Sequence, residues 1–142
     1  QALWPHVAVK IMDRALIKAQ GYERQVATEA RVLETASHPA IIRLVGTFST
    51  AESHFIVMEY MPRGDLHQAL SAAGSLDLEA ARFVCAEVVC GLEYLHCSLR
   101  VVYGDLKPEN VLLDAAGHAR LSDFGCARYI DPGAEADPGG AA

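Results

Sequence analysis

The sequence has no apolar run long enough to cross a membrane. Its apolar stretches are well short of the roughly 20 consecutive residues that a transmembrane helix needs. It also lacks a positively charged start followed by an apolar core, the pattern of a secretory signal peptide. We therefore expect no membrane partner and no signal peptide.

Positive charge is also scarce. The chain has 12 Lys and Arg against 18 Asp and Glu, which gives a formal net charge of −6 at pH 7. Proteins that bind nucleic acid usually carry a basic patch that neutralises phosphates, and no basic run is present here. The composition argues against a nucleic acid partner. The excess of acidic residues is explained by ordinary charged surface exposed to solvent, or by binding to a basic peptide.

Cysteines are few, and their spacing is not that of metal ligands. Cys85, Cys90, Cys97 and Cys126 lack paired arrangements; two of them fall on the helix predicted over residues 78–96, and Cys97 follows it directly. Free thiols of this kind are typical of a reducing compartment. We therefore predict an intracellular, cytoplasmic protein.

What the sequence does contain is a set of polar residues suited to phosphoryl transfer. The stretch Tyr-Gly-Asp-Leu-Lys-Pro-Glu-Asn at 103–110 carries Asp105, Lys107 and Asn110, and Asp123 follows it. Asp105 can accept the proton of an attacking hydroxyl, and Lys107 can neutralise charge on the moving phosphoryl group. Asn110 and Asp123 offer the oxygen ligands that Mg²⁺ prefers.

These groups must converge in space to act together. Residues 111–113 and 119–121 are short β-prone segments, and the turn sequence Asp-Ala-Ala-Gly joins them at 114–117. This pattern predicts a β-hairpin. The hairpin would bring Asp123 back beside Asp105.

The two motifs together resemble a known family. Asp-Leu-Lys-Pro-Glu-Asn at 105–110, followed by Asp-Phe-Gly at 123–125, is similar to the catalytic loop and metal-binding motif of eukaryotic protein kinases. Lys107 is typical of the serine/threonine kinases. The predicted helix over residues 78–96 resembles the matching helix of the cyclic-nucleotide-dependent, AGC-like kinases. An isolated Asp-Phe-Gly would be weak evidence, but both motifs in this order are specific.

The resemblance implies an α+β fold of the two-lobed kinase type, present here in part. A small antiparallel sheet with one helix would come first, and a helical lobe with the catalytic loop would follow. It also implies ATP and Mg²⁺ as cofactors, and transfer of the γ-phosphoryl group to a serine or threonine of a protein substrate. Acids at Asp65 and Glu109 would favour basic residues around the phosphorylated site.

Two residues of the predicted small lobe gain catalytic roles from the resemblance. Residues 7–11 have the alternating pattern of a strand and are rich in β-branched side chains, which predicts a strand. Residues 22–37 have apolar residues at helical spacing, which predicts a helix. In the family, the lysine of this strand holds the α- and β-phosphates and pairs with a helix glutamate. This assigns those roles to Lys10 and Glu29. Taken alone, both residues would be ordinary surface residues.

The resemblance places the adenine site at the end of the second of two further strands, predicted over 41–48 and 54–60. Backbone groups of Glu59 and Met61 would bind adenine, and Met58 would limit the pocket behind it. The alternative for the apolar residues is ordinary core.

Three other residues would complete the nucleotide site. Ala8 and Leu112 would lie above and below the purine. Asp65 would contact the ribose or a basic substrate residue, or would cap the short helix that starts at Leu66; both roles are compatible.

Asp77 or Ser75 is the expected cap of the next helix, residues 78–96, on which the catalytic loop would rest.

The chain departs from the family pattern in three places. No glycine occurs in residues 1–9, where the glycine-rich loop over the phosphates would lie. Gly104 stands where this kinase type usually has an arginine that pairs with a phosphorylated loop. No serine or threonine follows Asp123, and the Ala-Pro-Glu motif is missing. We therefore expect that Gly104→Arg has little effect unless a phosphorylated loop lies downstream.

These features predict a partial kinase domain over 1–130. Residues 1–61 would form the small lobe without its glycine-rich loop, 62–130 the start of the large lobe, and 131–142 a flexible tail rich in Pro, Gly and Ala. The first functional hypothesis is a serine/threonine protein kinase, present as a fragment. The alternative is a catalytically impaired remnant or pseudokinase that binds nucleotide or partners.

Overall fold

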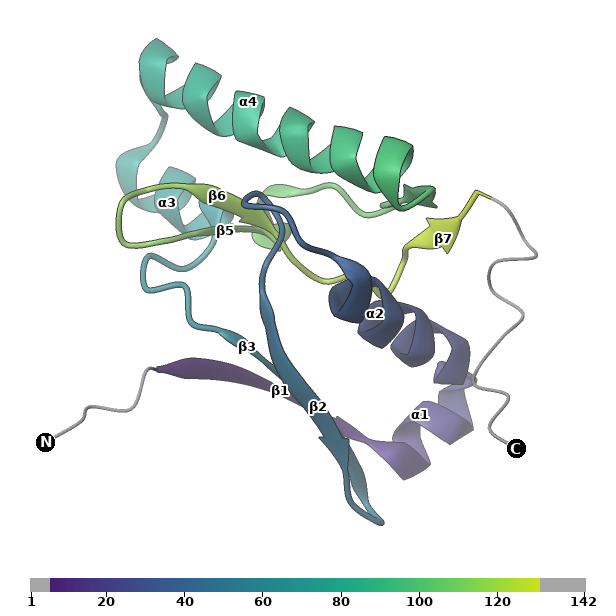
Figure 1. Ribbon diagram of the computed structural model, residues 1–142. Coiled ribbons are helices and arrows are strands. Elements are labelled where there is room, and N and C mark those ends of the chain that lie inside the picture. The colour runs from purple at the N-terminus through teal and green to yellow at the C-terminus, as the bar shows by residue number, and fades with distance from the viewer. Residues whose placement is uncertain (1–5, 131–142) are drawn as a thin grey trace, which may run out of the picture.

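The computed structural model describes residues 6–130. A small sheet and two helices come first, and a mostly helical part with a short hairpin follows (Figure 1). The elements are β1 (Val7–Asp13), α1 (Arg14–Gln20), α2 (Glu23–Thr35), β2 (Leu44–Ser49), β3 (Ser53–Glu59), α3 (Leu66–Ala73), α4 (Leu78–Glu93), β4 (Val101–Val102), β5 (Val111–Leu113), β6 (Ala119–Leu121) and β7 (Arg128–Tyr129).

The first sheet is antiparallel, with strand order β1-β3-β2. Helix α2 lies between this sheet and the helical part (Figure 1). β2 starts at Leu44, so the prediction of a strand from residue 41 was wrong. The reason is that Ile41 and Ile42 pair with β6 instead: the Ile42 N–H donates to the Leu121 carbonyl at 2.9 Å, and Ile41 forms a parallel bridge with Leu121.

The predicted hairpin forms from β5 and β6. Its turn is held by Asp114, whose Oδ1 accepts the backbone N–H groups of Ala116 and His118 at 2.9 Å each. Such side-chain bonds to the following backbone are the reason that aspartate favours turns. Helix α4 lies across this hairpin, and its Glu87 accepts the N–H of Ala119 at 2.7 Å.

Helix α4 corrects two expectations. Asp77 is the N-cap, since its Oδ1 accepts the Ala80 N–H at 2.8 Å, so the alternative Ser75 is wrong. The α-helix ends at Glu93 rather than at residue 96, and a π-helical turn, Tyr94–Ser98, continues it. Widened turns of this kind are rare and are hard to predict from apolar spacing.

Three elements were not predicted. Helix α1 has only one buried residue, Ile17, so its sequence carries little apolar periodicity. Asp13 caps it by accepting the Leu16 N–H at 2.9 Å. Strands β4 and β7 are two residues each and exist only because they pair with one another. Local sequence patterns are too short to indicate such elements.

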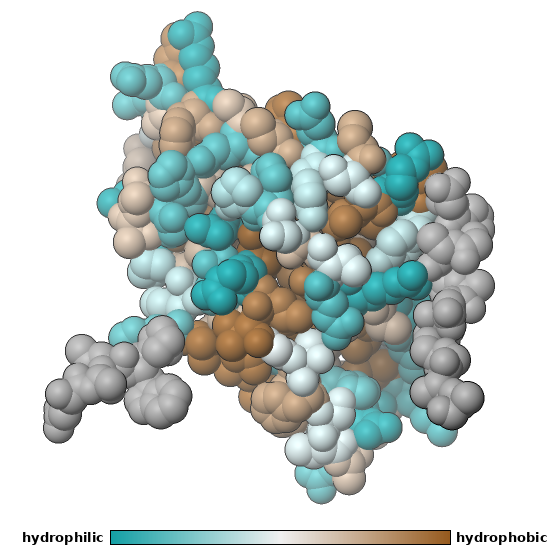
Figure 2. Space-filling model, in the orientation of Figure 1, coloured by the Kyte–Doolittle hydropathy of each residue, from teal (hydrophilic) through white to brown (hydrophobic). Residues whose placement is uncertain are grey.

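The main core lies between α2, α4 and the β5–β6 hairpin. Leu95, Leu121, Phe124 and Val32 are fully buried there. Hydrophobic side chains also gather on the face shown in Figure 2, over the small sheet, and they include exposed apolar residues of β1. No helix in the described part of the chain is long and apolar enough to cross a membrane.

The fold class is therefore as predicted, an incomplete two-lobed kinase-like α+β fold. The four cysteines are free and exposed, which confirms the prediction of unpaired thiols. The proposed flexible tail, 131–142, lies outside the described residues.

Candidate active site

Lys10 joins the small sheet to two acids from distant parts of the chain. Its Nζ lies 2.8 Å from both Oε atoms of Glu29 on α2 and 3.5 Å from Oδ1 of Asp123. Glu29 is 3% exposed, and a buried carboxylate needs a charged partner of this kind. Burial lowers the pKa of Lys10, but the charges and hydrogen bonds of Glu29 and Asp123 together outweigh this effect. The net shift of the pKa is upward, so the ammonium stays charged.

Asp105, Lys107 and Asn110 form a second group in the loop before β5. Lys107 Nζ lies 2.7 Å from Asp105 Oδ2, and Asn110 Nδ2 donates to the same oxygen at 2.9 Å and to the Asp105 carbonyl at 3.0 Å. The hydrogen bond from Lys107 lowers the pKa of Asp105, and the hydrogen bond from Asn110 lowers it further. Asp105 is therefore ionised at neutral pH and oriented as a hydrogen-bond acceptor.

Tyr103 and Ser122 connect this loop to the Asp-Phe-Gly segment. The Tyr103 hydroxyl donates to the Ser122 carbonyl, and the Tyr103 ring meets the Phe124 ring edge-on at 5.4 Å between centroids. Both the N–H and the hydroxyl of Ser122 donate to the Asn110 carbonyl, at 2.9 and 3.1 Å. Burial raises the pKa of Tyr103 far above its usual value, so the hydroxyl remains a donor.

Asp123 has an unusual backbone conformation. Its φ is 55°, one of two positive values outside glycine among the described residues. Aspartate tolerates this region better than most residues, and such strain is often found at functional sites. The Gly125 N–H donates to Asp123 Oδ1 at 3.3 Å, which holds the carboxylate in place.

The residues present fit a magnesium ion. The Asp123 side chain is 50% exposed, and its Oδ2 makes no hydrogen bond or ion pair within residues 6–130. The Nδ2 of Asn110 donates its hydrogen bonds to Asp105, so the amide oxygen of Asn110 is the atom that could bind the ion. In the described region no group of three or more His, Cys, Asp or Glu could hold a metal alone. Mg²⁺ usually takes only one or two protein ligands together with substrate phosphates, and Asn110 and Asp123 supply that number.

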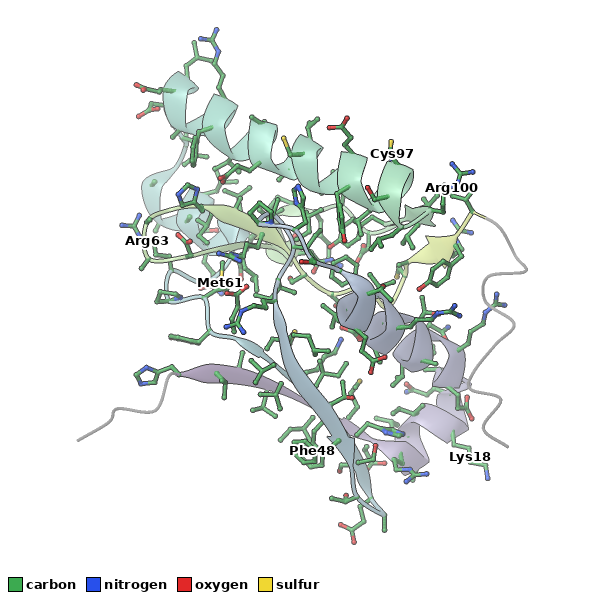
Figure 3. The ribbon with its side chains drawn as sticks, in the orientation of Figure 1. Lys18, Phe48, Met61, Arg63, Cys97 and Arg100 are labelled. Atoms are coloured by element: carbon green, nitrogen blue, oxygen red, sulfur yellow. The ribbon has the colours of Figure 1, made fainter. Side chains whose placement is uncertain are left out.

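The predicted adenine residues lie at the junction of the two parts. Ala8 on β1 is opposite Met58 on β3, and Leu112 on β5 forms a bridge with Asp65. Met61 is buried between the end of β3 and the β5–β6 hairpin (Figure 3). Their contacts with a nucleotide remain predictions.

Asp65 is the N-cap of α3. Its Oδ1 accepts the Gln68 N–H, and its Oδ2 accepts from Gln68 Nε2, both at 2.7 Å. The capping role predicted for this acid is therefore confirmed. The ribose or substrate role remains a prediction.

Gly104 has a structural role that sequence reasoning missed. Its φ is +82°, and a Cβ built there would lie 2.6 Å from the Cys126 carbonyl oxygen. The loop 103–110 therefore packs directly against the backbone that follows Asp-Phe-Gly at 123–125. The expectation that Gly104→Arg has little effect is wrong on this geometry, because any side chain at this position meets backbone that cannot easily move.

We expect Gly104→Ala to destabilise the chain by about 2 kcal/mol, because positive φ and the close contact both oppose a Cβ. Gly74→Ala is the matched control: its φ is +78°, but its Cβ would meet nothing within 4 Å. That variant should cost about 1 kcal/mol, from the backbone conformation alone. Urea denaturation measures both, and equal losses would show that the contact with Cys126 is unimportant.

The comparison with known proteins agrees with this geometry. The sequence matches the family described as protein kinase domain over residues 4–138. The cAMP-dependent protein kinase type 3 of Saccharomyces cerevisiae is 46% identical over 123 residues, which are 87% of this chain and 31% of that protein. The human putative serine/threonine-protein kinase PRKY is 41% identical over 123 residues, 87% of this chain and 44% of that protein.

A third relative is the 3-phosphoinositide-dependent protein kinase B of Dictyostelium discoideum, 39% identical over 126 residues, 89% of this chain and 14% of that protein. The chain thus spans less than half the length of each of these relatives. The family match itself covers nearly all of the chain, so the chain belongs to the protein kinase domain family, and its relatives include serine/threonine and cAMP-dependent kinases.

Proposed function

We propose that this chain is the nucleotide-binding and catalytic part of a serine/threonine protein kinase, which transfers the γ-phosphoryl group of ATP to a hydroxyl of a protein substrate. The observation that carries the proposal is the position of Lys10 Nζ between Glu29 and Asp123. It joins the predicted phosphate-binding lysine to the predicted metal ligand. These three residues come from separate segments of the chain, and only the folded structure brings them together.

In the proposed reaction, each polar group has a separate task. Lys10 holds the α- and β-phosphates, and Glu29 keeps Lys10 in place. Asp105 accepts the hydrogen bond of the substrate hydroxyl and then its proton. Lys107 leaves Asp105 to contact the γ-phosphoryl group.

Asn110 and Asp123 would hold Mg²⁺, which neutralises charge on the phosphates when it is bound. The proposal includes an intracellular, cytoplasmic location, which the four exposed free thiols support. It also includes a protein substrate with basic residues around the phosphorylated site, supported by the acid Glu109 in the same loop as Asp105.

The alternative is a catalytically impaired remnant or pseudokinase that binds nucleotide or partners without transferring phosphate. A thermal-shift titration with Mg²⁺-ATP tests whether the chain binds the nucleotide. We expect Mg²⁺-ATP to raise the unfolding temperature of the native chain by about 3 °C when its concentration is well above its dissociation constant. Asp123→Ala should lose this shift, because it removes a metal ligand.

Glu109→Ala is the control, since it also removes an exposed acid close to Asp105 but no predicted ligand. It should keep the shift. A native chain whose unfolding temperature does not respond to Mg²⁺-ATP would contradict a functional nucleotide site and would favour the alternative.

A further inference from the structure

The side chain of Glu59, the first residue of the predicted adenine-binding segment 59–61, is tied to two other parts of the chain. Its Oε1 accepts the Arg43 backbone N–H at 2.7 Å and a hydrogen bond from Arg120 Nη1 at 3.0 Å. The Glu59 N–H in turn donates to the Arg43 carbonyl at 3.0 Å. The adenine-binding role was assigned to the backbone of Glu59, and the side chain has this separate set of contacts.

Arg120 reaches Glu59 from the strand that leads to Asp123. It lies on β6 directly opposite Leu112 on β5, the residue predicted to lie below the purine. Residues opposite one another in an antiparallel pair project from the same face of the hairpin. Arg120 therefore spans from the floor of the predicted adenine site to the segment that would form its edge.

The surroundings of Arg120 show that it is held on both sides. Its Nη2 lies 3.8 Å from Asp114 Oδ2 in the β5–β6 turn. The Arg120 side chain is 23% exposed and that of Glu59 is 17% exposed, so solvent screens the pair only partly. Arg120 also lines a hollow of about 660 Å³ on the surface, together with Glu59, Met61 and Asp114.

The geometry of the Glu59–Arg120 pair is not one that contributes much to the stability of the fold. Arg120 Nε is buried and has no hydrogen-bond partner within the described residues. An unsatisfied buried donor costs free energy, and a largely buried ion pair can often be replaced by uncharged residues without loss of stability. Its two ends, however, lie on the two structural parts between which a nucleotide would bind. This location points to positioning rather than to stabilisation.

We propose that the Glu59–Arg120 pair sets the position of segment 59–61 relative to Leu112, which makes Arg120 a positioning residue for the adenine part of the nucleotide. This inference rests on the proposed function. The pair contacts no phosphate-binding or metal-binding residue of the site described above. Its loss should therefore weaken binding of adenosine and of Mg²⁺-ATP by the same factor.

The test is a double variant, Glu59→Gln with Arg120→Met, measured by titration calorimetry with adenosine and with Mg²⁺-ATP. Gln at 59 keeps an acceptor for the Arg43 N–H, and Met at 120 keeps most of the apolar stem. We expect both dissociation constants to rise about tenfold, the size of coupling typical of residues in contact. The unfolding temperature should stay the same or rise. The single variants should each give most of the effect, because either one breaks the pair.

Arg43→Met is the matched control, since Arg43 is exposed and its guanidinium makes no hydrogen bond or ion pair within residues 6–130. It should leave both affinities unchanged. A double variant that binds adenosine as tightly as the native chain overturns this inference alone. If the native chain binds neither ligand, the proposed function fails and the inference fails with it.

Discussion

Asp105→Asn is expected to lower the rate of phosphoryl transfer about 10³-fold, because a positioned proton acceptor contributes this much in many enzymes. The amide cannot accept the hydroxyl proton, and it keeps the size of the carboxylate. Mg²⁺-ATP binding should change by less than about threefold, since Asp105 is not among the predicted phosphate or metal ligands. Single-turnover transfer from labelled ATP to a serine-containing protein substrate, in the whole protein, measures the rate.

The hydrogen bonds around Asp105 define the control and the outcome against the prediction. Lys107 and Asn110 Nδ2 both donate to Asp105 Oδ2, so the Asn variant must present its oxygen to them to keep the loop in place. Glu93→Gln, an equally conservative change at an exposed acid, should leave transfer unchanged. Near-normal turnover of the Asp105 variant would show that another group accepts the proton.

Lys10→Met is expected to destabilise the chain by about 3 kcal/mol, because it leaves the Glu29 carboxylate without its charged partner. Glu29 is 3% exposed and the Lys10 side chain 35% exposed, so the loss should fall at the low end of what broken buried pairs cost. The same variant should bind Mg²⁺-ATP more than about tenfold more weakly, since an ammonium that holds two phosphates is gone. Urea denaturation and calorimetry measure the two effects separately.

The double variant Lys10→Met with Glu29→Leu separates stability from function. It removes both charges, so most of the lost stability should return, whereas the affinity for Mg²⁺-ATP should stay low. Lys18→Met is the control: Lys18 lies on α1 and points away from the site (Figure 3). Recovery of nucleotide affinity in the double variant would mean that Lys10 acts only as a partner for Glu29.

The sequence predicted the elements that carry the chemistry better than those that connect them. Helix α2, strands β1 and β3 and the β5–β6 hairpin have apolar periodicity or turn residues of their own, and they form close to where these patterns place them. Strands β4 and β7 have no such local signal. Neither forms without the other, so only the complete fold reveals them.

The contact between Gly104 and the Cys126 carbonyl was also beyond sequence reasoning. A glycine in place of an arginine reads as the loss of a charged contact. The structure shows a backbone at positive φ in a space too small for a side chain. The difference arises because steric limits depend on a segment that lies far along the chain.

By itself, the sequence determined which residue types are available for phosphoryl transfer, since Asp105, Lys107 and Asn110 are local in the chain and their spacing is visible in it. Tertiary structure alone decided that Lys10 meets both Glu29 and Asp123, and that the Glu59 side chain turns to Arg120. The physical reason is that such contacts join segments distant in sequence. Their geometry is set by how the sheet, helix α2 and the hairpin pack, which no local pattern records.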